Sequence, residues 1–267
     1  MIKLTFVKIG GSLITDKNKP YTVRPDYVKS VCMEIKKVLL DCSDTHLVLA
    51  NGVGSFAHTS AKKYDTMNGF HDENGRFGCA KVMYDALNIN RILIEQLLEE
   101  GIPAVHLQPS GIFLAENGQH KDEYIATLTA MIDQGLIPVL YGDVIIDTKK
   151  GSTIYSADKT MPLLIRKLNN SGKYNVNSFV NIGHYDGVLD NKNHLIQQIN
   201  SKNIEEVRTY FFDNKQIDVT GGMRTKVEEL FSLAKSGVNS IIVNGTILGR
   251  ACSAILGQDV KGTKITN

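Results

Sequence analysis

Short apolar runs that each end in a glycine or polar turn constrain this chain more than any other feature. Six such runs stand at residues 4–9, 46–50, 102–107, 137–146, 178–182 and 240–243. They are rich in β-branched residues and carry no polar alternation, which is typical of strands buried on both faces of a sheet. The sequence therefore predicts a sheet that is covered by helices on either side.

Helical patterns fill the segments between these runs. In residues 26–40 the apolar positions fall on one helix face, and Asp26 after Pro25 is a candidate N-cap. Three further helices are predicted over residues 77–100, 122–134 and 223–236, each followed by a glycine that can adopt the left-handed conformation. This alternation of strands and helices predicts an α/β fold with a mostly parallel central sheet.

Composition and charge exclude several classes of protein. The 267 residues include 30 Lys and Arg against 28 Asp and Glu, so a net charge of +2 gives no reason to expect nucleic acid as a partner. We expect no membrane association, because no apolar stretch is long enough to span a bilayer and residues 1–11 do not resemble a signal peptide. The four cysteines are scattered, as expected for reduced thiols in a cytoplasmic protein.

The first predicted strand ends in Lys8-Ile9-Gly10-Gly11-Ser12, and Lys17 follows shortly afterwards. Adjacent glycines at a strand end expose backbone N–H groups to an approaching anion, and lysines beside them suit a polyphosphate. Taken alone, the same residues favour a tight turn beside a solvated lysine.

The second predicted strand ends in a glycine turn whose residues Gly52, Gly54 and Ala57 match the G-x-G-x-x-G/A dinucleotide fingerprint. A rival interpretation is therefore an NAD-dependent oxidoreductase with Asp72 or Glu73 on the ribose. The fingerprint is short and follows the second strand, and no strong helix pattern opens at residue 55. The segment 257–264 fails as a Walker A loop because its lysine and threonine are reversed.

Two later segments add charged residues to glycine turns. Residues 141–143 read Tyr-Gly-Asp, and residues 154–159 bring Asp158 after a short apolar stretch. Residues 218–226 contain a diglycine that opens a predicted helix, with Lys226 in its first turns. The N–H groups and the positive dipole end at a helix start favour a phosphate.

In this order the motifs resemble those of the amino acid kinase superfamily, and within it most closely the isopentenyl phosphate kinases. The resemblance spans residues 8–263 and implies an open αβα sandwich. It also implies an acceptor-binding lobe over residues 1–150 and a lobe for Mg-ATP over residues 151–267. The motifs are Lys8-Ile9-Gly10-Gly11-Ser12, Thr15-Asp16-Lys17, Gly52 to His58, Pro138 to Asp143, Ser156-Ala157-Asp158, Asp186-Gly187-Val188, Asp218 to Met223 with Lys226, and Gly262-Thr263.

The resemblance assigns roles to individual residues. It implies that a phosphate oxygen of the acceptor attacks the γ-phosphorus of ATP, without a metal site built from protein ligands, because Mg²⁺ arrives with ATP. The catalytic candidates are Lys8, Lys17, His58, Asp158 and Lys226. The nucleotide-binding candidates are Gly10, Gly11, Ser12, Gly142, Asp143, Asp186, Gly222 and Met223, and the acceptor-binding candidates are Gly52, Val53, Gly54, Ser55 and His58. Of these glycines, Gly10, Gly11, Gly52 and Gly54 are expected to donate backbone N–H groups.

Several departures from the family pattern leave other functions open. Val53 and Ala57 stand where glycine is usual, and Lys159 and His184 replace acidic residues near the nucleotide. The alternatives are a kinase of the same fold for a phosphonate or another small acceptor, and a nucleotide-binding regulatory or inactive homologue. Candidates for the wall of the acceptor pocket are Phe70, Phe77, Met83, Tyr84 and residues 102–112. By resemblance, the helix over residues 77–100 predicts a homodimer interface.

Overall fold

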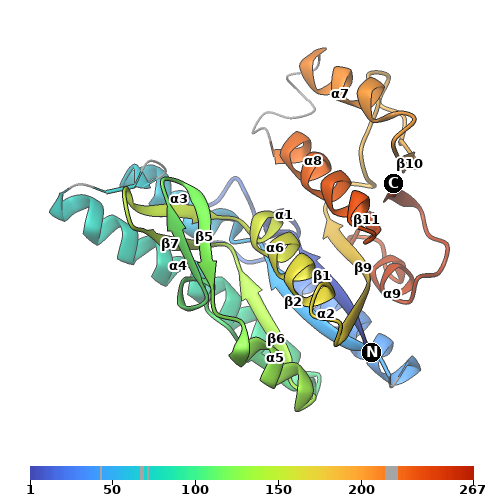
Figure 1. The fold of residues 1–267 in the computed structure, drawn as a ribbon, viewed down its shortest axis with the longest axis horizontal. Coiled ribbons are helices and arrows are strands. Elements are labelled where there is room, and N and C mark those ends of the chain that lie inside the picture. The colour runs from blue at the N-terminus through green and yellow to red at the C-terminus, as the bar shows by residue number, and fades with distance from the viewer. Residues whose placement is uncertain (43, 67–68, 71, 214–221) are drawn as a thin grey trace.

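An eight-stranded sheet runs through the centre of the computed structural model, which describes residues 1–267 except 43, 67–68, 71 and 214–221. The strand order is β10-β12-β11-β9-β1-β2-β6-β3, and neighbouring strands are parallel except for the pair β11 and β12. The predicted α/β class and mostly parallel sheet are confirmed (Figure 1). The strands are β1 (Ile2–Ile9), β2 (His46–Asn51), β3 (Ala104–His106), β6 (Ile137–Tyr141), β9 (Tyr174–Gly183), β10 (Gln198–Ile199), β11 (Ser240–Asn244) and β12 (Gly262–Ile265).

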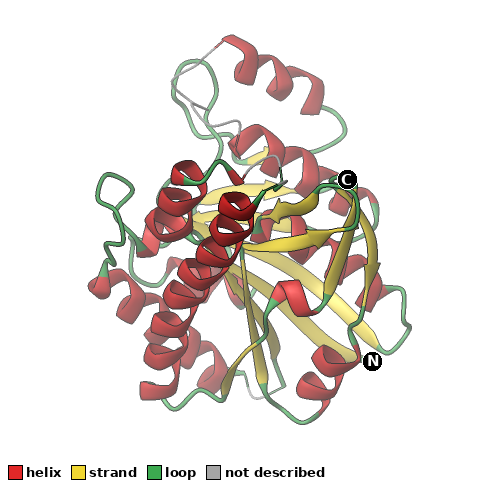
Figure 2. Cartoon of the chain, turned by 90° about the vertical axis from the view of Figure 1, so that its left-hand side faces the viewer, coloured by secondary structure: helices red, strands yellow, loops and turns green. Residues whose placement is uncertain are grey.

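Helices cover both faces of this sheet, as the αβα sandwich requires (Figure 2). The cause lies in the alternation of side chains along each strand. In β1, Leu4 and Phe6 point into one core with α5 (Ala126–Asp133), α6 (Ala157–Asn169), α7 (Ile204–Asp213) and α8 (Gly222–Lys235). Val7 and Ile9 point into the opposite core with α2 (Pro25–Asp41), α4 (Glu73–Glu99) and α9 (Arg250–Ile255).

A second sheet, ordered β5-β4-β7-β8, corrects the prediction of one strand over residues 137–146. The chain turns at Gly142, whose N–H donates to the Asn51 carbonyl, so β6 stays in the central sheet and the next strand leaves it. The small sheet also shortens the helix predicted over residues 122–134, because residues up to Glu123 pair with β4 and α5 begins at Ala126. Its strands are β4 (Phe113–Glu116), β5 (Gln119–Glu123), β7 (Asp143–Asp147) and β8 (Gly151–Tyr155).

Three helix starts differ from the sequence-based expectations. Helix α2 begins at Pro25 with Arg24 as its N-cap, so Asp26 lies inside the first turn and the prediction of Asp26 as the cap is wrong. Helix α3 (Gly54–Lys63) opens where no helix was expected. Helix α4 begins at Glu73 because the Asp72 carboxylate accepts the Gly75 N–H at 2.7 Å. Asp72 is thus a helix cap, which removes a support for the dinucleotide interpretation.

The turns after β1 and β2 are interlocked backbone to backbone. A Cβ atom on Gly11 would lie 2.5 Å from the Gly54 nitrogen, and one on Gly52 would lie 2.6 Å from the Gly11 nitrogen. Gly54 has φ +49°, which an L-residue rarely adopts, and a Cβ atom there would lie 1.9 Å from the Thr15 hydroxyl oxygen. The short helix α1 (Gly11–Ile14) and helix α3 therefore start side by side at the carboxyl edge of the sheet.

The helices that the structure describes include none whose length and apolar content would let it cross a lipid bilayer. The four cysteines are all free thiols, and three of them are buried.

We expect Gly11→Ala to lower the free energy of unfolding by roughly 3 kcal/mol, because its new methyl group would force apart two backbone segments. Urea unfolding measures this difference. Gly111→Ala is the matched control, since the space around Gly111 is open and its φ is not left-handed, and it should change stability by less than about 0.5 kcal/mol. Equal stability of the two variants would show that the turns are not in close contact.

Candidate active site

Lys8, Asp158 and Lys226 form one ion cluster although the two lysines are far apart in the sequence. Lys8 lies on β1 near its carboxyl end, Asp158 in the first turn of α6, and Lys226 in the first turns of α8. The Lys8 ammonium is 2.9 Å from one carboxylate oxygen of Asp158, and Lys226 donates to the other oxygen. The side chains of both lysines are largely buried.

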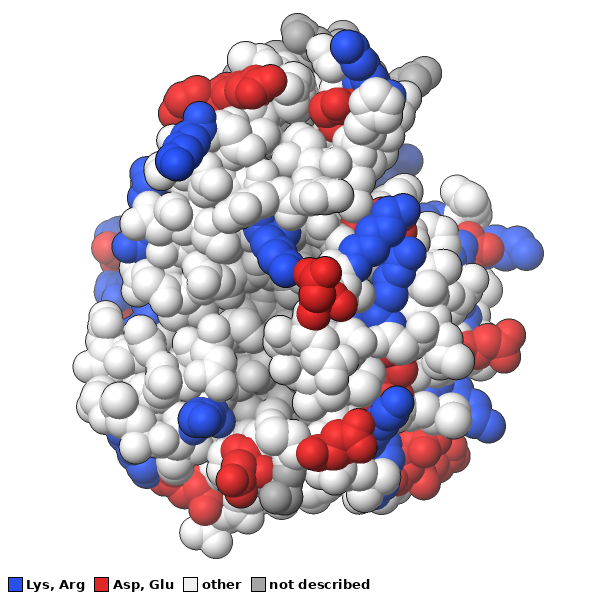
Figure 3. All heavy atoms as spheres, turned by 90° about the vertical axis from the view of Figure 1, so that its right-hand side faces the viewer, with Lys and Arg blue, Asp and Glu red and all other residues white. Residues whose placement is uncertain are grey.

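This cluster carries an excess positive charge. Burial raises the pKa of Asp158, but Lys226 and Lys8 outweigh that effect and hold the pKa well below its ordinary value. Burial lowers the pKa of Lys226, Asp158 opposes the shift, and Lys8 adds to it. One carboxylate thus holds two ammonium groups together at the carboxyl edge of the sheet, an arrangement that can neutralise a phosphoryl group. Figure 3 shows basic side chains around a hollow in the face to the right of Figure 1.

Two of the expected backbone donors already have partners inside the fold. The Gly10 N–H donates to Ile182 at 2.7 Å and the Gly52 N–H to Ile9 at 2.8 Å, which corrects the expectation that both bind phosphate. Gly11 and Ser12 remain candidates, because they open α1 and the first N–H groups of a helix have no carbonyl within it to accept them.

Ser55 is built into the contact between the two turns. Its N–H donates to the Thr15 hydroxyl at 3.1 Å, and its own hydroxyl accepts the Thr22 N–H at 3.3 Å. The Thr15 hydroxyl in turn donates to the Gly11 carbonyl at 2.7 Å. Val53 is half-buried, and a Cβ atom on Gly142 would lie 3.5 Å from its side chain, so Val53 lies beside this turn. These contacts hold the turn after β2 against the first glycine turn.

His58 and Lys17 lie near each other on the exposed side of these turns. His58 is in the second turn of α3 and exposed, and Lys17 is exposed in the loop after α1. Partial desolvation lowers the pKa of His58, and the charge of Lys17 adds to the shift. Desolvation lowers the pKa of His184, which directly follows β9, and the charges of Arg24 and Lys17 add to the shift. Basic groups from three elements therefore face a common region.

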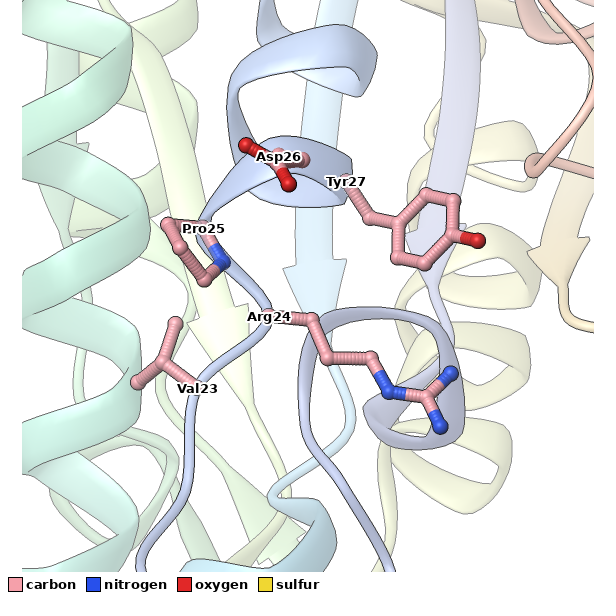
Figure 4. Close-up of a pocket in the computed structure, with 5 residues that line it drawn as sticks. All are labelled: Val23, Arg24, Pro25, Asp26 and Tyr27. Atoms are coloured by element: carbon pink, nitrogen blue, oxygen red, sulfur yellow. The ribbon is translucent and has the colours of Figure 1, made fainter.

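A pocket of about 450 Å³ lies at the start of α2, lined by Val23, Arg24, Pro25, Asp26 and Tyr27 (Figure 4). Figure 4 shows the Arg24 guanidinium and the Tyr27 phenol on the same side of this segment. The Tyr27 ring makes an edge contact with His184 at 6.4 Å between ring centroids. The site residues predicted from the sequence did not include Arg24. Its place as the one basic residue between Pro20 and Pro25 was a signal for it.

Two predicted nucleotide contacts, Asp143 and Asp186, have internal partners. Asp143 is buried and accepts the N–H groups of Ser110 and Val144 at 3.1 and 2.8 Å, and burial raises its pKa to about 6. Hydrogen bonds from Lys261, Asn244 and Arg250 hold the pKa of Asp186 at about 2. Asp143 thus links the start of β7 in the small sheet to Ser110. Asp186 links the loop after β9 to the C-terminal segment.

The remaining predicted residues divide into two groups. Gly222 and Met223 open α8 close to Lys226, while Asp218 to Gly221 of the same motif lie outside the described residues. Lys159 is held by the small sheet, where its ammonium donates to the Gly118 carbonyl at 3.1 Å and lies 3.8 Å from the centre of the Tyr155 ring. Its substitution for an acidic residue therefore leaves the ion cluster intact.

The candidates for the acceptor pocket also divide. Phe70 and Met83 pack against a small core that contains Ala57 of α3, whereas Phe77 and Tyr84 are exposed on α4. Phe70 and Met83 are therefore the better candidates for an apolar wall beside the acceptor loop.

In the part of the chain that the structure describes, no three His, Cys, Asp or Glu side chains gather as metal ligands. Both oxygens of Asp158 are hydrogen-bonded to ammonium groups. The donor set of this site suits a phosphate, and Asp158 is not placed to supply a ligand to a metal ion.

Comparisons with known proteins find relatives over nearly the full length of the chain. The sequence model of the amino acid kinase family matches residues 3–244. Isopentenyl phosphate kinase of Methanocaldococcus jannaschii is 32% identical over 272 residues, and that of Methanothermobacter thermautotrophicus is 31% identical over 278; the alignments cover 98% of this chain and 98% and 99% of theirs. A solved isopentenyl phosphate kinase superposes with a TM-score of 0.80 at 29% identity, covering 98% of this chain and 100% of its own. The product complex of the T. acidophilum enzyme superposes with a TM-score of 0.75 at 25% identity, covering 98% and 99%.

Asp143 makes stability depend on pH in a predictable direction. Its pKa is about 6 in the folded chain and about 3.9 in an unfolded one, so the stability it contributes is present below pH 4 and is lost as pH rises through 6. The free energy of unfolding of Asp143→Asn minus that of the wild type should therefore be larger at pH 8 than at pH 4, by roughly 3 kcal/mol. Urea unfolding at both pH values measures this change. A difference that is the same at both pH values would contradict a raised pKa.

Proposed function

The chain belongs to the amino acid kinase family, and on this premise we propose that it transfers the γ-phosphoryl group of ATP to isopentenyl phosphate, giving isopentenyl diphosphate. The observation that carries the proposal is the carboxylate of Asp158, which joins Lys8 and Lys226 at the edge of the sheet. Its support is the near full-length similarity to isopentenyl phosphate kinases.

The proposed reaction is a direct transfer between two bound substrates. A phosphate oxygen of the acceptor forms a bond to the γ-phosphorus, and the bond from that phosphorus to the bridging oxygen of ADP breaks. Lys8 and Lys226 neutralise the charge on the moving group, and Asp158 keeps the two ammonium groups in place. The N–H groups of Gly11 and Ser12 add uncharged donors. Both nucleophile and electrophile come from substrates, so no covalent enzyme intermediate is required.

His58 is proposed to hold the acceptor phosphate. It lies on α3, directly after the acceptor loop of Gly52, Val53 and Gly54, and its imidazole can donate to a phosphate oxygen. The lowered pKa favours the neutral ring, which still has one N–H to donate. Lys17, whose charge acts on His58, is proposed as a further contact with the ATP phosphates.

We assign residues 1–150 to the acceptor lobe and residues 151–267 to the nucleotide lobe. Mg²⁺ is proposed to enter as part of the substrate Mg-ATP, held mainly by the phosphates. Gly222 and Met223 are proposed nucleotide contacts at the start of α8, while Gly142, Asp143 and Asp186 act through the internal contacts described above.

We also propose a cytoplasmic homodimer. Strand β3 is the last strand of the central sheet, and beside it α4 borders a groove of about 590 Å³. Leu98 is 55% exposed there, which suits a surface that a second copy covers. The groove is lined by Arg91, Ile94, Glu95, Leu98, Glu99 and His106.

The free cysteines agree with a reducing compartment, and thus with the proposed cytoplasmic location.

Incubation with Mg-ATP and a panel of acceptors tests the function. We expect ADP and isopentenyl diphosphate, identified by mass spectrometry, to form with isopentenyl phosphate and much more slowly with a phosphonate such as fosfomycin or with amino acids. Faster turnover of the phosphonate would favour the same-fold alternative. No turnover of any acceptor, with nucleotide binding retained, would favour an inactive homologue.

Lys226→Met should lower kcat by about 100-fold or more, because it removes one of the two ammonium groups that neutralise the transferring phosphoryl group. The matched control is Lys235→Met, which removes an exposed ammonium from the last turn of the same helix. The control should keep kcat within about twofold. If both variants keep wild-type kcat, Lys226 has no part in the chemistry.

A further inference from the structure

Asn181 is a buried carboxamide in an apolar strand. It lies between Val180 and Ile182 on β9, and only 2% of it is exposed. Neither its side-chain oxygen nor its side-chain nitrogen has a hydrogen-bond partner in the structure. Within the described residues it is the one buried side chain with two unpaired polar atoms. A buried unpaired polar group costs about 1–3 kcal/mol, and an apolar residue would avoid that cost.

The position of Asn181 links it to the ion cluster. Asn181 is the register partner of Lys8 on the neighbouring strand β1. The neighbours of Lys8 and of Asn181 along each strand point their side chains into the core with α2, α4 and α9. Lys8 and Asn181 therefore face the other side of the sheet, which α6 and α8 cover. Asp158 and Lys226 stand on these two helices. Asn181 therefore lies on the sheet surface directly beside Lys8 and below the helices that carry the other two charged groups.

We propose that Asn181 is a nucleotide contact, whose side-chain N–H donates to a phosphate oxygen of the bound ATP or ADP; this rests on the proposed kinase function. Paired residues on adjacent strands have Cα atoms about 4.8 Å apart. Their side chains start from neighbouring points on the same face of the sheet, so a phosphate group bound by the Lys8 ammonium would lie above Asn181.

Movement of the lysine side chains gives the phosphate access to this carboxamide. The ammonium groups of Lys8 and Lys226 are the ends of flexible side chains, and their hydrogen bonds to Asp158 are the contacts that a phosphate would share or replace. A neutral donor at position 181 adds a hydrogen bond without adding to the repulsion between the two cations. The carboxamide oxygen is left to accept from an ammonium group.

Leucine at position 181 separates this role from a structural one. Asn181→Leu keeps the branching of the side chain and removes the unpaired polar atoms, while its bulkier methyl groups fill the site more tightly, so its free energy of unfolding without ligand should stay within about 1 kcal/mol of the wild type. We expect its Kd for ADP, measured by calorimetry with Mg²⁺ present, to rise at least tenfold, and the KM for the acceptor to change less than twofold.

Two further variants complete the experiment. Asn181→Asp keeps the shape but replaces the donor by a negative charge, and its Kd for ADP should rise more than that of the leucine variant. Ser240→Ala removes another buried unpaired polar group, at the far end of the neighbouring strand β11, and should leave the Kd unchanged.

An unchanged Kd for ADP in Asn181→Leu, or in a folded Asn181→Asp should the leucine variant not fold, would overturn the inference. It would indicate a buried water as the partner. Because ADP binding is measured without an acceptor, this result is independent of whether isopentenyl phosphate is the substrate. A wild type that binds ADP but does not phosphorylate isopentenyl phosphate would instead refute the proposed function.

Discussion

The site depends on one carboxylate that holds two ammonium groups. Without Asp158, Lys8 and Lys226 would repel each other in a partly buried space, and each would lose its counter-ion. With it, a strand and two helices are fixed relative to one another, and the cluster keeps a single excess positive charge. That excess is what a negatively charged phosphoryl group can neutralise, so the same interaction organises the fold and prepares the site.

The fold brings this cluster beside a second structural constraint, the contact between the turns after β1 and β2. Gly11, Gly52 and Gly54 allow backbone to lie against backbone, and Thr15 fixes the contact through Gly11 and Ser55. The turn after β2, the proposed acceptor loop, is therefore positioned by the strand that also carries Lys8. Two substrates bound on either side of these turns would meet at a distance that the main chain sets.

Sequence reasoning recovered the layers because they follow from periodicity, which is local. It missed the break at Gly142 and the helix that opens at Gly54, since the first depends on a hydrogen bond to Asn51 and the second on packing against another turn. In the site, the order of motifs indicated Lys8, Asp158 and Lys226, and the structure places them together. The partners of Gly10, Asp143 and Asp186 come from distant segments and could not be read from sequence. The sequence shows Asn181 as a carboxamide between apolar residues. Only its position beside Lys8 in the structure indicates a role for it.

The interlocked glycine turns also limit how this scaffold can be redesigned. A single methyl group at Gly11 or Gly52 would already collide with main-chain atoms, so the floor of the site admits almost no variation. Selectivity for a longer or shorter substrate would then have to be altered in the walls, for which Phe70 and Met83, packed against the small core that contains Ala57, are the proposed positions. Directed evolution of this protein toward new acceptors would be expected to accumulate changes around α3 and α4 and to leave the two turns untouched.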